Sequence, residues 1–320
     1  MRKFLGCVTI AAASVLMGAA GSVVTGQAAL QADKCFANDY QVQRIPADQV
    51  VEACTRLLAE GSVDFTLVNE AGTLNNRGTA YLDLGKLDLA FADFNAALRI
   101  KPDGVSSLTN RGSIYLKKRN FDAAIADYSA VIGKSPNHLS AYINRGVAYL
   151  KKHDIDSAIR DFDYAKQLDR QSYAAFVNKS LALLERGDFA GANTEAAAAT
   201  DLHPTYFWSY NLHCLLKASA KRDLSGAQAD CNEALQRSNN NYVVYESVGL
   251  LNFQGGKYRD AVTAYDKFLA VEPNEPVALY MRGLSKRQLG DNAGADRDVA
   301  AAKALDPKVE ALYMPLGSSS

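Results

Sequence analysis

The feature that most constrains the fold of this chain is a repeat with a period of 34 residues. The tripeptide Asn-Arg-Gly begins at Asn76, Asn110 and Asn144, and a fourth step of equal length reaches Asn178. Other residues recur at this interval or its multiples: Gly78, Gly112 and Gly146; Tyr81, Tyr115 and Tyr149; Ala90, Ala124, Ala158 and Ala192; Phe94, Tyr128 and Phe162; Pro102, Pro136 and Pro204. Such a chain folds into similar units, each covering the apolar side of its neighbour.

These residues resemble the tetratricopeptide repeat (TPR), a helix–turn–helix unit with small residues where its helices touch, aromatic residues between them and proline at the exit. Seven units are expected over residues 71–308, starting near the following residues: Ala71, Val105, Leu139, Tyr173, Phe207, Tyr242 and Pro276. The resemblance implies an all-α fold, a right-handed α-solenoid (superhelix) of about seven helix hairpins. The first helix of each hairpin would line a concave groove.

The N-terminus has the pattern of a signal peptide. Arg2 and Lys3 precede a long uncharged, Ala-rich apolar stretch, and small residues at Gly26 and Ala28 suit cleavage after Ala28. We therefore predict that residues 1–28 are removed on export to the periplasm or the exterior. The alternative is a retained membrane anchor, because the uncharged stretch is long enough to span a bilayer. Membrane association is expected only through an uncleaved signal peptide.

Two further segments flank the repeats. Residues 29–70 are predicted to form a degenerate N-terminal helical unit with a disulfide. Its helix over residues 49–59 would take the place of a second helix, with Cys54 where the next unit has Phe94. Residues 309–320 are predicted to form a short capping helix turn and a tail.

Export changes how the cysteines are interpreted. Without Cys7, the chain retains Cys35, Cys54, Cys214 and Cys231. An even number in an oxidising compartment favours disulfides, and four cysteines permit three pairings. Cys214 replaces the small residue of a helix contact and Cys231 replaces the aromatic residue opposite it. This placement favours the pairs Cys214–Cys231 and Cys35–Cys54, with buried free thiols as the alternative.

Two positions of the repeat carry charges that change together. The seventh position holds Arg77, Arg111, Arg145, Lys179, His213 and Arg282. When one extra residue in the fifth unit is allowed for, the twenty-third holds Asp93, Asp127, Asp161, Glu195, Asp230 and Asp298. In the sixth unit both charges are absent, because Val248 and Ala264 stand there. The two positions lie opposite each other in an antiparallel hairpin. We therefore predict an ion pair within each hairpin that carries both charges, contributing about 0–1 kcal/mol where exposed.

The resemblance also assigns a binding face, formed by positions two, five, six, nine and twelve of each first helix. The predicted peptide-binding residues are Asn76, Asn110, Asn144, Asn178, Ile143, Val147, Val177, Leu181, Trp208 and Leu215. The four asparagines form a ladder similar to that of the O-GlcNAc transferases, and a carboxamide both donates to and accepts from a peptide backbone. The alternatives are that these asparagines only bond neighbouring backbone and that Trp208 packs as core.

Composition and motifs narrow the function further. The chain carries 35 basic and 35 acidic residues, and this balance argues against binding to nucleic acid. The histidines belong to no recognisable catalytic motif, and His213 with the nearby cysteines lacks a fourth metal ligand. We predict no enzymatic activity, no metal and no cofactor. The expected function is an exported scaffold that binds a protein or extended peptide. The alternatives are a self-assembling envelope-structural protein and an enzyme subunit with an unrecognised site.

Overall fold

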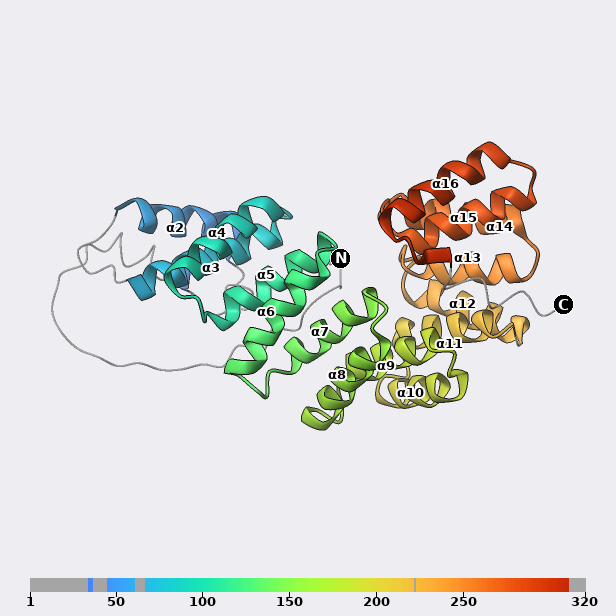
Figure 1. Cartoon of the computed structure of the whole chain (residues 1–320), viewed down its shortest axis with the longest axis horizontal. Coiled ribbons are helices and arrows are strands. Elements are labelled where there is room, and N and C mark those ends of the chain that lie inside the picture. Colours follow the sequence, from blue (N-terminus) through green and yellow to red (C-terminus); the bar gives the residue numbers. More distant parts are fainter. Residues whose placement is uncertain (1–33, 37–44, 61–66, 222, 311–320) are drawn as a thin grey trace. The chain divides into compact units, whose positions relative to one another are not determined.

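The computed structural model describes residues 34–36, 45–60, 67–221 and 223–310, so the predicted signal peptide lies outside the described part. The described secondary structure is helical (Figure 1). Its helices are α2 (Ala47–Glu60), α3 (Leu67–Asp83), α4 (Leu87–Ile100), α5 (Val105–Lys117), α6 (Phe121–Lys134), α7 (Leu139–Lys151), α8 (Ile155–Leu168), α9 (Tyr173–Glu185), α10 (Phe189–Leu202), α11 (Phe207–Ser219), α12 (Leu224–Arg237), α13 (Val244–Gln254), α14 (Tyr258–Leu269), α15 (Pro276–Gln288) and α16 (Asn292–Leu305). No helix in this part is long and apolar enough to cross a membrane.

The chain forms two compact units, Met1–Asp169 and Arg170–Ser320. In the first unit, α2 precedes the hairpins α3–α4, α5–α6 and α7–α8. The second unit contains the hairpins α9–α10, α11–α12, α13–α14 and α15–α16. Each unit is an all-α solenoid of antiparallel helix hairpins, as the repeat predicts.

The helices begin in step with the sequence repeat. The first helices α5, α7, α9 and α11 begin at Val105, Leu139, Tyr173 and Phe207, which are the predicted starts. In the first repeat α3 begins at Leu67, four residues before the predicted Ala71, and in the sixth α13 begins at Val244, two residues after the predicted Tyr242. The period therefore sets the helix boundaries wherever the turn residues keep the same spacing.

In four hairpins a glycine of the first helix faces an aromatic ring of the second, in the pairs Gly78–Phe94, Gly112–Tyr128, Gly146–Phe162 and Gly249–Tyr265. A Cβ atom added to Gly146 of α7 would lie 2.6 Å from Cε1 of Phe162 on α8, and Gly249 has the same relationship with Tyr265 at 2.6 Å. Both aromatic rings are buried. The glycines are therefore needed for the close approach of the aromatic ring of the second helix to the first helix.

The turn inside each hairpin ends the first helix with a left-handed residue. Gly85, Gly187 and Gly290 have φ of +72°, +82° and +85°, respectively. Arg119 and His153 take the corresponding place in the α5–α6 and α7–α8 hairpins, with φ of 57° and 61°. The turn geometry is therefore preserved where glycine is not.

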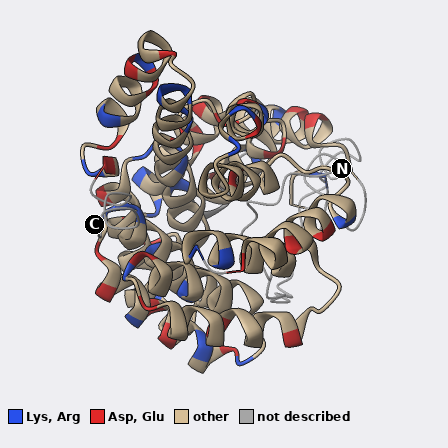
Figure 2. Ribbon diagram, turned by 90° about the vertical axis from the view of Figure 1, so that its right-hand side faces the viewer, with Lys and Arg blue, Asp and Glu red and all other residues tan. Residues whose placement is uncertain are grey.

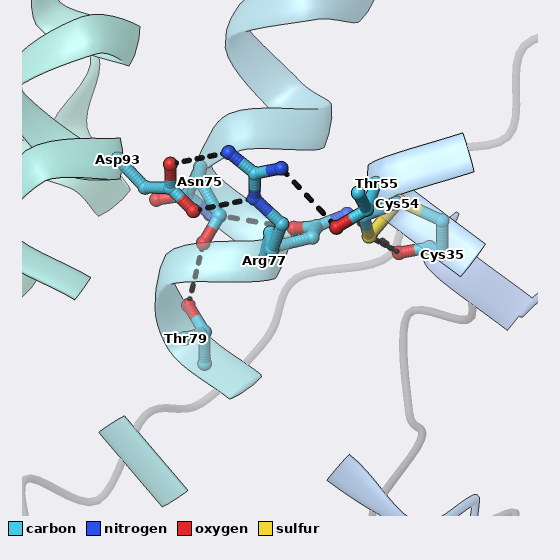
Figure 3. Close-up of a disulfide and its surroundings, with 8 residues drawn as sticks. Cys35, Cys54, Thr55, Asn75, Arg77, Thr79 and Asp93 are labelled. Carbon is cyan, nitrogen blue, oxygen red and sulfur yellow. Dashed lines mark hydrogen bonds and ion pairs between the residues drawn. A yellow bond between two sulfur atoms is a disulfide. The ribbon is translucent and has the colours of Figure 1, made fainter. Parts of the chain in front are cut away.

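Both predicted disulfides are present. Cys35 and Cys54 are bonded with a Cα–Cα distance of 5.0 Å, and Cys214 and Cys231 with 5.3 Å. All four residues are buried. The first bridge fastens the segment around Cys35 to α2 (Figure 3), and the second joins α11 to α12.

Candidate functional site

The predicted ion pairs form within the hairpins. Arg77, Arg111, Arg145 and Arg282 each donate two hydrogen bonds, 2.7–2.8 Å long, to the carboxylate of the paired aspartate. The four aspartates are buried. Hydrogen bonding to the carboxylate raises the pKa of each arginine against the opposing effect of burial. These arginines are engaged inside the fold, which supports a structural role.

Each of these arginines also reaches the preceding helix hairpin or, for Arg77, helix α2. Arg77 Nη1 donates to Thr55 on α2 at 3.2 Å (Figure 3), and Arg111 Nη1 donates to Asn95 on α4 at 2.8 Å. The corresponding acceptors for Arg145 and Arg282 are Ser129 and Asp266. The sequence interpretation missed these acceptors, although each directly follows Cys54 or an aromatic residue that fills a hairpin. One guanidinium thus ties three helices together.

The fourth and fifth repeats depart from this arrangement. Lys179 pairs with Glu195 at 2.8 Å, as predicted. His213 instead hydrogen-bonds Thr200 at 3.0 Å, and Asp230 pairs with Lys217 at 2.8 Å. Burial lowers the pKa of His213, which disfavours its charged form. The predicted His213–Asp230 ion pair is therefore wrong, because a lysine one turn later on α11 takes over the carboxylate.

In the first unit the predicted asparagine ladder is part of a hydrogen-bonded strip. Asn76 Nδ2 donates to the carbonyl of Cys35 at 3.0 Å, and Asn110 Nδ2 donates to Thr79 Oγ1 at 3.3 Å. Ser107 Oγ donates to Asn75 Oδ1 at 3.0 Å, again between α5 and α3. These bonds bring the first helices together on one half-buried polar face.

The rest of the predicted face in this unit lies on α7. Asn144, Ile143 and Val147 are all half-buried. Since α7 contacts α5, the polar strip and these two aliphatic side chains belong to consecutive first helices. The first helices therefore offer polar side chains on α3 and α5 and apolar ones on α7.

In the second unit the predicted residues lie on α9 and α11. Asn178 Nδ2 donates to the carbonyl of Ala174 in its own helix at 2.8 Å, so its amide nitrogen is not used between hairpins. Val177 and Leu181 are half-buried. On α11, Trp208 and Leu215 are also half-buried, and Leu215 packs against the core of the unit.

The sequence interpretation missed one residue at a position of the predicted binding face. Asn211 occupies the fifth position of its repeat, one turn after Trp208 and one turn before Leu215 on α11. It is 6% exposed, and its Oδ1 atom is buried without a hydrogen-bond partner among the described residues. The positional rule of the repeat would have found it. A buried carboxamide oxygen that accepts no hydrogen bond lowers the stability of the fold unless another group supplies the missing bond.

The start of α11 carries a cluster of aromatic rings. Trp208 lies 5.3 Å from Phe207, and Tyr206 lies 5.3 Å from Phe207 and 5.4 Å from Tyr173, measured between ring centroids. Tyr206 is 37% exposed, whereas burial raises the pKa of Tyr173 to about 12. The cluster therefore has one ring at the surface and others packed behind it.

The described residues hold no group of histidine, cysteine and acidic side chains suited to a metal ion. A hollow of about 360 Å³ lies near Arg111, and one of about 300 Å³ lies beside Leu251. Neither is lined by a predicted peptide-binding residue. Basic and acidic residues are interspersed along the helices (Figure 2). The first helices are thus the main candidates for a binding face.

Repeated hairpins whose first helices lie side by side define the class of helical-repeat scaffolds. The chain belongs to the tetratricopeptide repeat family, whose sequence pattern matches residues 71–103, 109–175 and 249–310. Proteins built on these repeats generally act as protein–protein interaction scaffolds rather than enzymes. No curated protein matches the chain in sequence.

Solved structures share the fold at low sequence identity. One chain of the APC/C hetero-tetramer Cut9–Hcn1 is 14% identical, with a TM-score of 0.58, over 92% of this chain and 57% of that chain. A TPR protein from Parabacteroides merdae is 19% identical, with a TM-score of 0.50, over 92% of this chain and 100% of its own. A TPR protein of Thermus thermophilus is 18% identical, with a TM-score of 0.50, over 57% and 98%. The present chain thus spans little more than half of the Cut9–Hcn1 chain that it matches.

Proposed function

We propose that this protein is an exported scaffold that binds an extended polypeptide on the first-helix faces of its two units. The observation that carries the proposal is the polar strip of the first unit, in which Asn76 and Asn110 are fixed by bonds to neighbouring elements. A side chain that is already fixed loses little conformational freedom when it binds.

The strip keeps hydrogen-bonding capacity for a partner. A carboxamide has two N–H donors and an oxygen with two lone pairs. The bond from Asn110 to Thr79 uses one donor, and Asn110 is half-buried rather than buried. Its remaining groups suit the alternating N–H and C=O groups of an extended backbone, while Ile143 and Val147 suit apolar side chains.

The second unit supports the same mode of binding through α11. Trp208, Asn211 and Leu215 are spaced by three and four residues, so they share one face of the helix. Asn211 lies buried beneath this face, so Trp208 and Leu215, which are half-buried, would make the contacts with a peptide. The indole of Trp208 would supply an aromatic anchor of the kind that dominates many interfaces.

The two disulfides support export. Disulfides persist in oxidising compartments and are rare in the cytosol. Both bridges are buried within the fold, at Cys35–Cys54 and Cys214–Cys231. Together with the signal-peptide pattern of residues 1–28, they favour a periplasmic or secreted protein.

The test is capture of a partner from an envelope extract by the mature chain, read by mass spectrometry. Asn110→Ala/Asn144→Ala should lose the partner while keeping its helical circular dichroism. Asn137→Ala, at an exposed asparagine in the α6–α7 loop, is the matched control and should retain it.

A peptide from the captured protein should then change the fluorescence of Trp208, the single tryptophan of the chain. Full retention of the partner by both the ladder variant and Trp208→Ala/Leu215→Ala would contradict the proposal. Light scattering that shows large assemblies of the mature chain, with no partner captured, would favour self-assembly instead.

A further inference from the structure

We propose that the Cys214–Cys231 disulfide is a redox switch that holds α12 on α11 and thereby keeps the α11 face in its binding form. The switch regulates the second of the two faces assigned above, so its binding consequence rests on that proposed function. Its structural consequence, the docking of α12, stands on the geometry of the hairpin alone.

Helix α12 buries little apolar surface of its own. Its buried side chains are Ala227, Cys231 and Ala234. The second helix of the next hairpin, α14, buries Tyr265, Phe268 and Leu269 besides two alanines. Since hydrophobic stabilisation follows the apolar area removed from water, α12 is held less firmly than α14 without its covalent bond.

The disulfide stands where other hairpins have their packing contact. Cys214 takes the place of Gly249 in the next hairpin, and Cys231 takes the place of Tyr265, whose ring lies against that glycine. Two thiols fill this seam less well than a ring does. Reduction therefore removes the covalent bond and leaves an underfilled contact in the same place.

The ion pair across this hairpin is made by Lys217 and Asp230 instead of by the residue at the seventh position. His213 bonds to Thr200 of the preceding hairpin, and Asp230 depends on Lys217, whose side chain is 35% exposed. By contrast, Arg111 and Arg145 make two-bond contacts with buried aspartates. A half-buried pair with a single bond resists the opening of a helix less than a buried pair with two bonds.

The backbone at both ends of α12 is irregular. Asp223, which caps its N-terminus, has φ of +56°, and Asn239 and Asn240 after its C-terminus have φ of +53° and +59°. Left-handed backbone is costly for residues other than glycine, although less so for Asn and Asp. These positions come in addition to the left-handed turn residue that the other hairpins share. They favour local opening at this hairpin over its neighbours.

Helix α12 supports the start of α11 directly. Arg237 donates to the carbonyl of Thr205 at 3.3 Å and lies 4.8 Å from the ring centroid of Tyr210. Loss of α12 would remove both contacts beside Trp208. The binding face of α11 would therefore lose its support when the disulfide opens.

The chemical step is thiol–disulfide exchange with a dithiol reductant. One thiolate of the reductant attacks a sulfur of the bridge, the S–S bond breaks, and the second thiol of the reductant releases the mixed disulfide. Two electrons and two protons pass to Cys214 and Cys231, and the reductant becomes a disulfide. Both sulfurs belong to fully buried residues, so opening of α12 controls access.

The test uses the mature chain carrying Cys35→Ser/Cys54→Ser, so that one bridge remains, oxidised or treated with dithiothreitol. A thiol count of two establishes reduction. We expect amide exchange in α12 to accelerate by at least about tenfold on reduction, and the fluorescence of Trp208 to shift. Cys214→Ser/Cys231→Ser in the same background should match the reduced protein without any reductant.

The matched control is Cys214→Gly/Cys231→Tyr, which restores the residue pair of the next hairpin. It should protect α12 equally with and without dithiothreitol. Unchanged α12 protection in both the reduced protein and the serine variant would overturn the proposal. If protection falls as expected but the oxidised protein captures no partner, the switch stands and the binding function fails.

Discussion

Arg111 of α5 and Asp127 of α6 are joined by two hydrogen bonds of 2.8 and 2.7 Å, and the same guanidinium donates a third, of 2.8 Å, to Asn95 of the preceding hairpin. Arg111 therefore joins the two helices of its own hairpin and also joins that hairpin to the preceding one. Because Asp127 is 5% exposed, removal of its partner would leave a buried carboxylate without compensation.

Arg111→Val should lower the free energy of unfolding by about 2–3 kcal/mol, since a buried charge loses its partner. Arg111→Val/Asp127→Ala reproduces the pair Val248 and Ala264 that the sixth repeat carries. The double variant should be more stable than the single one. Urea unfolding followed by circular dichroism measures both, and equal stability of the two variants would refute the role of the pair.

The glycines of the hairpin seam give a second prediction. Gly146→Ala should destabilise the protein by about 1–3 kcal/mol, because its Cβ would meet the ring of Phe162 at 2.6 Å. Gly133→Ala is the control: nothing lies within 4 Å of its added Cβ, and it occupies the exposed face of α6. This control should be neutral or stabilising by up to about 1 kcal/mol in thermal unfolding.

The parts of the fold that follow from the repeat could be predicted from the sequence. A shared period placed the helix starts at Val105 and Leu139, and paired substitutions at Cys214 and Cys231 identified a disulfide. In each case two positions of the repeat contact each other, so a change at one is accompanied by a change at the other. Comparing the repeats of a single sequence is therefore enough to identify the contact. The ion pairs between seventh and twenty-third positions were predictable for the same reason.

Acid should weaken the protein through Asp298. Burial pushes the pKa of this carboxyl up, but hydrogen bonds from Arg282 and Lys286 outweigh it and hold the pKa below its ordinary 3.8. A carboxyl with a depressed folded pKa contributes stability that is present above its unfolded pKa and lost as the pH falls through the folded one.

We therefore expect Asp298→Asn to cost about 2 kcal/mol at pH 7 and progressively less below pH 4. Urea titrations between pH 7 and pH 2 would measure the difference between variant and wild type. A difference that stays constant over this range would show that the charge of Asp298 is not responsible.

The covalent state of the mature protein gives a fourth prediction. Cleavage after Ala28 would remove Cys7 and leave four cysteines, all in the two bridges. Protein from the envelope, denatured without reductant, should then show no free thiol, and four after reduction. N-terminal sequencing should begin at Ala29. Four free thiols before reduction would contradict both bridges in the exported protein.

Much of the candidate site depends on side-chain choices that the period does not fix. Asn178 keeps the place of Asn110 in the repeat, yet its amide nitrogen bonds its own helix through Ala174. Asp230 is paired by Lys217 rather than by the residue at the seventh position. In both cases several acceptors or donors lie within reach, and the local packing selects among them.

Each of the four arginines donates a third hydrogen bond, from Nη1, to the helix that precedes its hairpin. This bond limits where the chain can gain or lose residues without breaking a contact. Arg145 is bonded to Asp161 in its own hairpin and to Ser129 in the preceding one. A deletion that begins or ends between Arg145 and Asp161 would therefore leave one of the two charged side chains without the other. Excision of residues 139–172, one full period, would instead remove Arg145 together with Asp161 and leave the Arg111–Asp127 pair intact. Gain or loss of one whole repeat therefore preserves these ion pairs, whereas a cut inside a repeat breaks one.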